Sequence, residues 1–283
     1  MGGGEVEPFD INNYLTIVAL EDGLTAALSG NTVEYCVDGD ENWKSLASNT
    51  ASESINKGQT LSFRGNLTPA SSKGVGTFTI SKSCDLIGNC NSLLFGDNAK
   101  TNLSLSGKNY AFYYLFYNCT TIKNVSSNFL PAKTLATYCY YCMFYRCTSL
   151  TTASGILPAP TLANYCYSHM FDGCSSLITA PALPATTLAQ GCYYYMFHGC
   201  SSLTTAPELP ATRLTSTCYN CMFLSCSKLN YIKALFTTTP SSTYTSAWVS
   251  GVASRGTFVK NKNATWNVTG ASGIPSGWTV QTA

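Results

Sequence analysis

The chain has 283 residues and a formal net charge of +2, from 16 basic and 14 acidic side chains. Only 11% of its residues are charged, against about 25% in an average soluble domain. This balance provides no basic surface for nucleic acid. No apolar run reaches the ~20 residues that a membrane-spanning helix needs.

The segment from Met1 to Val6 contains no apolar core of the kind that a secretory signal peptide requires. We therefore expect any leader or membrane anchor to be absent from this chain. Residues 1–10 are expected to be a disordered tail or a remnant of expression.

Residues 11–97 show the alternation of apolar and polar side chains that is typical of β-strands. Asp38-Gly39, which follows the second such segment, is a hairpin signal. Several short strands separated by turn residues favour a small all-β, sandwich-like domain. The predicted strands cover residues 15–19, 33–37, 61–63 and 77–80.

Residues 98–236 repeat one unit about five times. The clear copies read Met-Phe-x-x-Cys-x-x-Leu, and the phenylalanines of all five copies lie 26 to 28 residues apart. A fixed period of this length is typical of a solenoid, in which each unit buries its apolar face against its neighbours. The four clear copies begin at Met143, Met170, Met196 and Met222, and a degenerate copy begins at Leu115.

Each unit predicts one helix and one short strand. Leu188, Cys192 and Met196 lie four residues apart, which places them on one face of a helix of two to three turns. Gly199 is expected to end that helix. The threonine-rich segment 204–210 contains proline and is expected to form a short strand. Stacked units of this kind predict an α/β solenoid.

The third clear copy, residues 196–212, reads Met-Phe-x-Gly-Cys-Ser-Ser-Leu-Thr-Thr-Ala-Pro-Glu-Leu-Pro-Ala-Thr and resembles the BspA-like branch of the leucine-rich repeats. The similarity covers residues 107–236. It implies a solenoid of the leucine-rich-repeat type and a secreted bacterial cell-surface protein. The units differ from that branch in being longer and in having Ala-Pro where a β-branched residue is usual.

Residues 237–283 depart from the period and are expected to form a C-terminal capping segment. A short helix is predicted over residues 247–252, and strands are predicted over 256–259 and 278–280. Trp248 lies in this segment and is expected to help shield the open end of the solenoid.

Nine of the 14 cysteines recur with the repeat. We expect them to be reduced and to pack the core as small apolar residues. Disulfides between neighbouring positions would need Cα atoms ~4.4–6.8 Å apart, closer than packed helices usually bring them. Outside the repeats, Cys84 and Cys90 are the better candidates for a disulfide. The two cysteine ladders are Cys119, Cys147, Cys174, Cys200 and Cys226, and Cys139, Cys166, Cys192 and Cys218.

Little in the sequence indicates metal or acid–base chemistry. Cys139-x-x-Cys142 and Cys166-x-x-His169 have zinc-like spacing one repeat apart. They are a weak metal candidate, because Cys139 and Cys166 already belong to a ladder, and no cofactor is expected. His169 and His198 fit a polar surface position. No Ser-His-Asp order or glycine-rich phosphate loop is present, so the chain is not expected to be an enzyme.

The sequence therefore favours a non-enzymatic surface protein whose solenoid presents an extended face for adhesion or for binding a protein of a host or neighbouring cell. The expected contact positions are Thr152, Thr179, Thr205 and Tyr231. One alternative is a glycan-binding module, favoured by tyrosine clusters such as Tyr193–Tyr195, although their periodicity also fits internal packing. The other alternative is a passive surface stalk.

Overall fold

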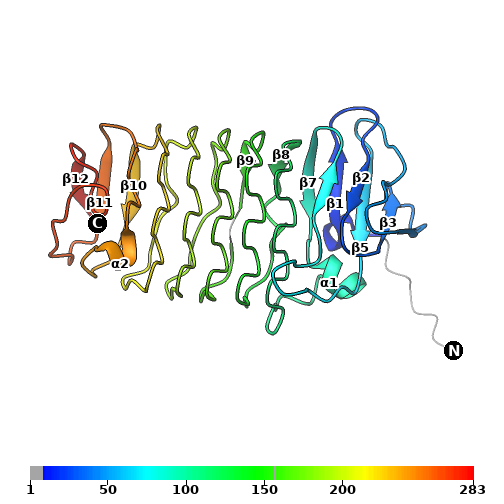
Figure 1. The fold of residues 1–283 in the computed structure, drawn as a ribbon, viewed down its shortest axis with the longest axis horizontal. Coiled ribbons are helices and arrows are strands. Elements are labelled where there is room, and N and C mark those ends of the chain that lie inside the picture. The colour runs from blue at the N-terminus through cyan, green and yellow to red at the C-terminus, as the bar shows by residue number, and fades with distance from the viewer. Residues whose placement is uncertain (1–8, 156) are drawn as a thin grey trace.

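The computed structural model describes residues 9–155 and 157–283, which form one elongated body (Figure 1). The N-terminal strands lie at one end, stacked coils follow along the long axis, and the C-terminus lies at the other end. The solenoid predicted from the repeats is confirmed. The predicted tail falls mostly on residues 1–8, which lie outside the described residues.

The N-terminal region is an antiparallel sheet, and the strands predicted there are confirmed. A separate strand pair packs on this sheet through Phe78, whose ring centroid lies 5.1 Å from that of Phe63. The sheet order is β4 (Lys44–Leu46), β3 (Val33–Val37), β5 (Thr60–Arg64), β1 (Leu15–Ala19) and β7 (Cys84–Gly88); the separate pair is β2 (Ala26–Leu28) and β6 (Phe78–Ile80). Three short helical segments, η1 (Ile11–Asn13), α1 (Ser92–Phe95) and η2 (Gly96–Asn98), flank it.

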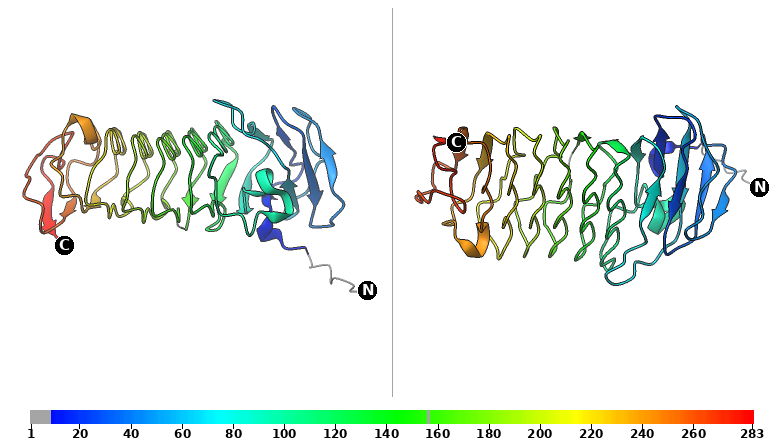
Figure 2. Two further views of the ribbon diagram at one scale, coloured as in Figure 1. Left: turned by 90° about the horizontal axis from the view of Figure 1, so that it is seen from below. Right: turned by 45° about the horizontal axis from the view of Figure 1, so that its top comes forward.

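The same sheet continues into the solenoid. β8 (Ile122–Val125) pairs in parallel with β7, and β9 (Thr152–Ala153) pairs in parallel with β8. A self-contained sandwich is therefore not confirmed. Figure 2 shows the antiparallel strands closing one end of the stack of coils. In this arrangement the antiparallel sheet pairs with the strand edge that the first coil of the solenoid would otherwise expose.

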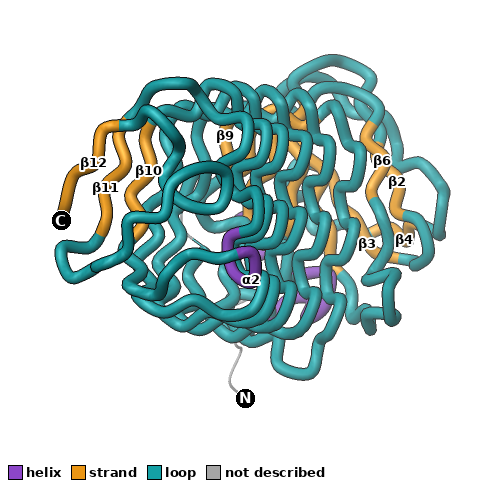
Figure 3. The backbone as a smooth tube through the Cα atoms, turned by 60° about the vertical axis from the view of Figure 1, so that its left-hand side comes forward, coloured by secondary structure: helices purple, strands orange, loops and turns teal. Residues whose placement is uncertain are grey.

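The helix predicted in each repeat unit is wrong. The corresponding segments are runs of consecutive turns, drawn as loops in Figure 3. We call each run a turn ribbon; the five ribbons cover residues 109–118, 137–146, 164–173, 190–199 and 216–225. Within them every fourth residue has a left-handed backbone, with φ between 52° and 77°. An α-helix cannot contain such residues.

The backbone hydrogen bonds explain why turns replace the helix. The N–H of Cys139 donates to the carbonyl of Ala136, three residues back, at 3.2 Å. The next N–H, of Tyr140, donates instead to the carbonyl of Cys166 in the following coil at 3.0 Å. This alternation continues along each ribbon, so about half of its donors depend on the neighbouring coil. The four-residue spacing of the apolar side chains is thus the period of the ribbon. The same spacing also fits one face of a helix, which is why a helix was predicted.

Two aromatic columns fill the interior. The first contains the repeat phenylalanines, whose rings stack with centroids 5.5 to 5.7 Å apart, and this confirms that they form one internal column. The second has centroid spacings of 5.6 to 5.9 Å. All of these residues are buried. The columns are Phe78, Phe116, Phe144, Phe171, Phe197 and Phe223, and Phe112, Tyr140, Tyr167, Tyr193 and Tyr219.

The C-terminal segment continues the coiling. The two predicted strands are confirmed and extend a parallel sheet of β10 (Tyr231–Ala234), β11 (Thr257–Lys260) and β12 (Thr279–Thr282). The helix predicted over 247–252 is wrong, because the only turn of α-helix here is α2 (Ser242–Thr245). Trp248 is fully buried and ends both columns, with its ring 6.0 Å from Tyr219 and 6.2 Å from Phe223.

Candidate functional site

The four positions predicted to contact a partner lie on the outward side of the solenoid strands, which we call the sheet face. Parallel bridges join Thr152 to Thr179 and Thr205 to Tyr231. Thr179 and Thr205 are exposed, and Thr152 and Tyr231 are partly exposed. The predicted alignment across strands is therefore present within each pair. This row offers hydroxyl groups and no charge.

A second long surface is formed by the turn ribbons. Along each ribbon, two inward residues alternate with two outward ones. In residues 137–146, the pairs Cys139–Tyr140 and Met143–Phe144 are buried, whereas Tyr138, Tyr141 and Tyr145 are partly exposed. We call the surface made by the outward residues of the five ribbons the turn face.

Tyrosine dominates the turn face. Its rings stack across coils: the centroid of Tyr138 lies 5.0 Å from that of Tyr110 and 5.1 Å from that of Tyr165, with the rings within 8° of parallel. Tyr113 on Tyr141 and Tyr117 on Tyr145 repeat this arrangement at 4.9 and 5.0 Å. The ten partly exposed tyrosines of this face, from a total of 18, are Tyr110, Tyr113, Tyr114, Tyr117, Tyr138, Tyr141, Tyr145, Tyr165, Tyr194 and Tyr195.

The stacking decides which parts of these rings are available. Because neighbouring rings cover one another's faces, the ring edges and hydroxyl groups remain for contact with a partner. Burial raises the pKa of Tyr114, Tyr138 and Tyr141 above its usual value. The phenols therefore stay neutral at physiological pH and can both donate and accept hydrogen bonds.

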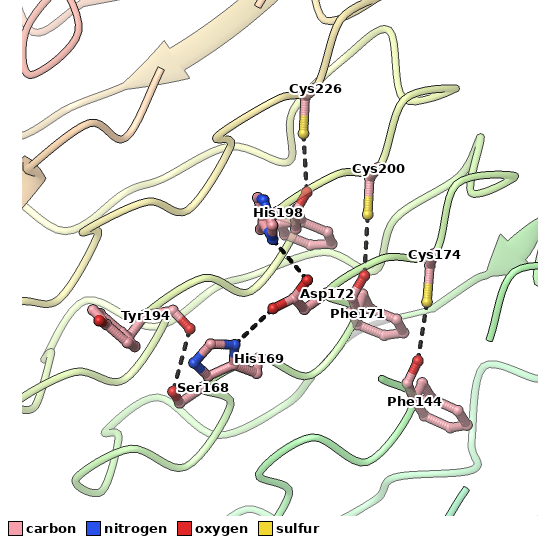
Figure 4. A network of polar contacts seen from close by, with 11 residues as sticks. Phe144, Ser168, His169, Phe171, Asp172, Cys174, Tyr194, His198, Cys200 and Cys226 are labelled. Atoms are coloured by element: carbon pink, nitrogen blue, oxygen red, sulfur yellow. Dashed lines mark hydrogen bonds and ion pairs between the residues drawn. The ribbon is translucent and has the colours of Figure 1, made fainter. Parts of the chain in front are cut away.

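Asp172 links two histidines of neighbouring coils in the turn face (Figure 4). Its carboxylate oxygens lie 2.7 Å from Nδ1 of His169 and 2.8 Å from Nδ1 of His198, and its side chain is only 9% exposed. The ring of His169 stacks on Tyr195 with centroids 4.8 Å apart. Both imidazoles can donate from Nδ1 and keep Nε2 as an acceptor. The carboxylate thereby orients both rings.

This cluster does not bring a nucleophile to a base. The hydroxyl of Ser168, next to His169 in the chain, donates to the main-chain carbonyl of Tyr194 at 3.2 Å. Cys142 occupies the position equivalent to His169 one coil earlier and is 4% exposed; burial, and then the charge of Asp172, raise the pKa of its thiol. A thiol held in its protonated form is a poor nucleophile.

The weak metal candidate is divided between two sides of the ribbon. Cys139 and Cys166 are fully buried on the inner side, whereas Cys142 and His169 belong to the outer positions. Within residues 9–155 and 157–283, no group of three or more His, Cys, Asp or Glu side chains could hold a metal ion.

The cysteines of the first ladder have a defined bonding role (Figure 4). Four of its five thiols donate to the carbonyl of a phenylalanine in the preceding coil, at sulfur–oxygen distances of 3.0 to 3.2 Å, whereas the thiol of Cys119 lies 3.3 Å from the hydroxyl of Thr121. The pairs are Cys147 with Phe116, Cys174 with Phe144, Cys200 with Phe171, and Cys226 with Phe197. All 14 cysteines, Cys84 and Cys90 included, are free and buried.

The sequence prediction missed the turn face as a surface. Tyr113 and Tyr141, and likewise Tyr117 and Tyr145, recur at the spacing of the first two repeat phenylalanines. This recurrence was the signal from which a row of outward tyrosines could have been predicted. A helical period of 3.6 does not reproduce the two-in, two-out alternation, so the helix hypothesis could not separate outward tyrosines from inward ones.

Comparison of the chain with family models, with curated proteins and with solved structures finds no match. In the part of the chain that the structure describes, no helix has the length and apolar character needed to cross a bilayer.

Proposed function

We propose that this chain is a non-enzymatic, secreted cell-surface protein of the BspA-like leucine-rich-repeat kind, and that its turn face binds a protein partner. The observation that carries the proposal is the patch of cross-stacked tyrosines over successive coils. The resemblance of the Met-Phe-x-x-Cys-x-x-Leu units supports the family and the extracellular location.

The chemistry of the patch suits a protein interface. A tyrosine offers a large contact area and a hydroxyl group while it loses little conformational freedom on binding. Here the rings are already held by their neighbours, which lowers the ordering cost further. The charged side chains in the patch are few: Asp172 contacts two imidazoles, and the guanidinium of Arg146 lies 5.3 Å from the ring of Tyr145. A partner therefore displaces little tightly held water from charged groups.

The same geometry makes this face less suitable for a glycan. A sugar ring usually packs its C–H groups on the open face of an aromatic ring. In the stacks Tyr110–Tyr138–Tyr165 and Tyr113–Tyr141 the ring faces that are turned toward each other are covered, and Tyr138 has a tyrosine on both faces. The tyrosines of the inner column, such as Tyr193, are buried and unavailable.

The two long faces can be tested against each other. The purified chain would be immobilised and exposed to solubilised surface proteins of host and neighbouring cells, and the bound proteins would be identified and then purified for affinity measurement. Two variants serve as a matched pair: Tyr141→Ser with Tyr145→Ser on the turn face, and alanine at Thr152, Thr179, Thr205 and Tyr231 on the sheet face.

We expect the turn-face variant to lose ten-fold or more in affinity, since exposed tyrosines often dominate interface energy at about 2 kcal/mol or more each. The sheet-face variant should bind as the unmodified chain does. If binding is lost only in the sheet-face variant, the predicted positions on the sheet face are the contact site and the turn face is not. If neither variant changes the affinity of any partner, the solenoid faces are not binding surfaces.

A further inference from the structure

A cleft of about 410 Å³ lies in the N-terminal region, outside the solenoid coils. Its walls come from η1 and the residues beside it, the loop between β3 and β4, the end of β5, and η2 with the residues that follow it. Sites for small molecules usually measure roughly 300–1,000 Å³. The cleft is therefore large enough for a ligand of that class.

Charged side chains gather in this cleft. They make up five of its 11 lining residues, although only 11% of the whole chain is charged. The five are Asp10, Glu41, Arg64, Asp97 and Lys100. Both signs are present, and Lys100 pairs with Asp10 at 3.2 Å. In a chain this poor in charge, such a concentration indicates a surface that contacts a strongly hydrogen-bonding ligand.

The polar groups are held in fixed positions. Arg64 donates from Nη1 to both carboxylate oxygens of Asp97, at 2.9 and 3.1 Å, and from Nε to Glu34 at 2.8 Å. The hydroxyl of Tyr14 donates to Asp97 at 2.9 Å, and burial raises its pKa to about 12, so it stays a donor. The guanidinium of Arg64 lies 4.1 Å from the ring centroid of Trp43. Groups fixed in advance bind a ligand at a lower entropic cost.

One wall of the cleft is aromatic. The rings of Phe9 and Tyr14 stack with centroids 5.2 Å apart, and the ring of Trp43 lies 5.0 Å from that of Tyr14. Beside this wall, the side-chain oxygen of Asn13 is buried and has no hydrogen-bond partner among the residues that the structure describes.

The combination selects one chemical class. An anion such as phosphate would face Asp10, Glu41 and Asp97, and a metal cation would face Arg64 and Lys100. A neutral molecule with many hydroxyl groups avoids both conflicts, because its hydroxyls donate to carboxylates and amides and accept from basic groups. We propose that this cleft binds a neutral sugar, as a mono- or disaccharide unit of a glycan. The site is separate from the turn face and does not depend on the protein-binding proposal.

The test uses the full chain on an array of neutral, sulfated and phosphorylated oligosaccharides, followed by titration calorimetry with any neutral sugar that binds. Three variants are compared. Glu41→Ala with Asn98→Ala removes two exposed cleft side chains without touching the core. Trp43→Ala removes part of the aromatic wall, and Tyr141→Ser on the turn face is the control. Thermal melting checks that each variant folds, and inorganic phosphate and Ca²⁺ are titrated as competing probes.

We expect a neutral sugar to bind, with affinity reduced ten-fold or more in both cleft variants and unchanged in Tyr141→Ser. The proposal is overturned if no neutral sugar binds, if sugar binding is unaffected in the folded cleft variants, or if only phosphate or Ca²⁺ binds there. Loss of sugar binding in Tyr141→Ser alone would place the sugar on the turn face and also overturn it. A failure of protein capture by the turn face leaves the result for the cleft unaffected.

Discussion

The thiol of Cys200 donates a hydrogen bond to the main-chain carbonyl of Phe171 in the preceding coil, across 3.2 Å. That carbonyl also accepts the N–H of Cys174 within its own coil at 3.0 Å. One carbonyl thus closes a turn and receives a bond from the next coil. The cysteine of the repeat motif is small enough to be buried beside the phenylalanine column and still supplies a donor.

Replacing Cys200 with alanine should therefore lower the free energy of unfolding by about 1–2 kcal/mol, from one hydrogen bond and a small cavity. Cys192 of the same coil is the matched control: it is equally buried, and its thiol makes no hydrogen bond within the described residues. Cys192→Ala should lower the free energy of unfolding by less than Cys200→Ala does. Urea unfolding followed by circular dichroism measures both, and equal losses would show that the thiol bond contributes nothing.

The buried thiols predict a sharp loss of stability at alkaline pH. Burial raises the pKa of Cys139 and Cys226 to about 12 and that of Cys218 to about 11, whereas an unfolded thiol titrates near 8.5. Because the folded values are the higher ones, this contribution is fully present below pH ~8.5 and is lost as the pH rises through the folded values. Stability should be flat from about pH 7 to 8 and fall steeply above about pH 9.

Thiol counting provides an independent check of the same burial. At pH 8 the native chain should react with almost no thiol reagent, and after denaturation all 14 cysteines should react. Rapid labelling of several thiols in the native state, or stability that stays constant through pH 11, would contradict the burial of the ladders.

Tyr140 is expected to tolerate loss of its hydroxyl group. Within the described part of the chain, its oxygen is buried without a hydrogen-bond partner, and the preceding member of its column is a phenylalanine, Phe112. Tyr140→Phe should leave stability unchanged or raise it by up to about 1 kcal/mol, because an unpaired buried hydroxyl is unfavourable. Tyr140→Ala is the contrasting variant and should cost about 3–5 kcal/mol. A loss above about 1 kcal/mol in Tyr140→Phe would reveal a hidden partner for the hydroxyl.

Replacing Thr217 with glycine should stabilise the folded chain. Its φ is 54°, in the left-handed region, and its hydroxyl is buried without a hydrogen-bond partner in residues 9–155 and 157–283. The preceding coil has Gly191 at the equivalent position, with φ 59°. Thr217→Gly is expected to raise the free energy of unfolding by about 0.5–1 kcal/mol, since a β-branched residue is strained there. Thr217→Val keeps the backbone strain and the β-branched side chain, and should not raise the melting temperature.

The repeat motif was sufficient to predict the solenoid and its internal phenylalanine column, because Phe144, Phe171 and Phe197 recur with the coil itself. Side chains at equivalent positions of stacked coils must meet. The strands near Leu15 and Val33 were likewise predictable, since alternation with a period of two is specific to strands.

The conformation of the ribbons was not predictable in this way. Cys192 and Met196 have the same spacing in a helix and in a ribbon of turns, so the spacing alone did not separate the two conformations. The ribbon forms because N–H groups such as that of Tyr193 bond to the following coil, which a single unit lacks. The contact between Asp172 and His198 depends on the same stacking, since these residues are 26 positions apart.

The sequence by itself therefore determined that this chain stacks its repeats around an aromatic core, because a periodic apolar pattern can be buried only by its own copies. The tertiary structure alone decided the local backbone, the outward tyrosines and the N-terminal cleft. Each of these depends on contacts between residues far apart in the chain, and a local pattern contains no information about such partners.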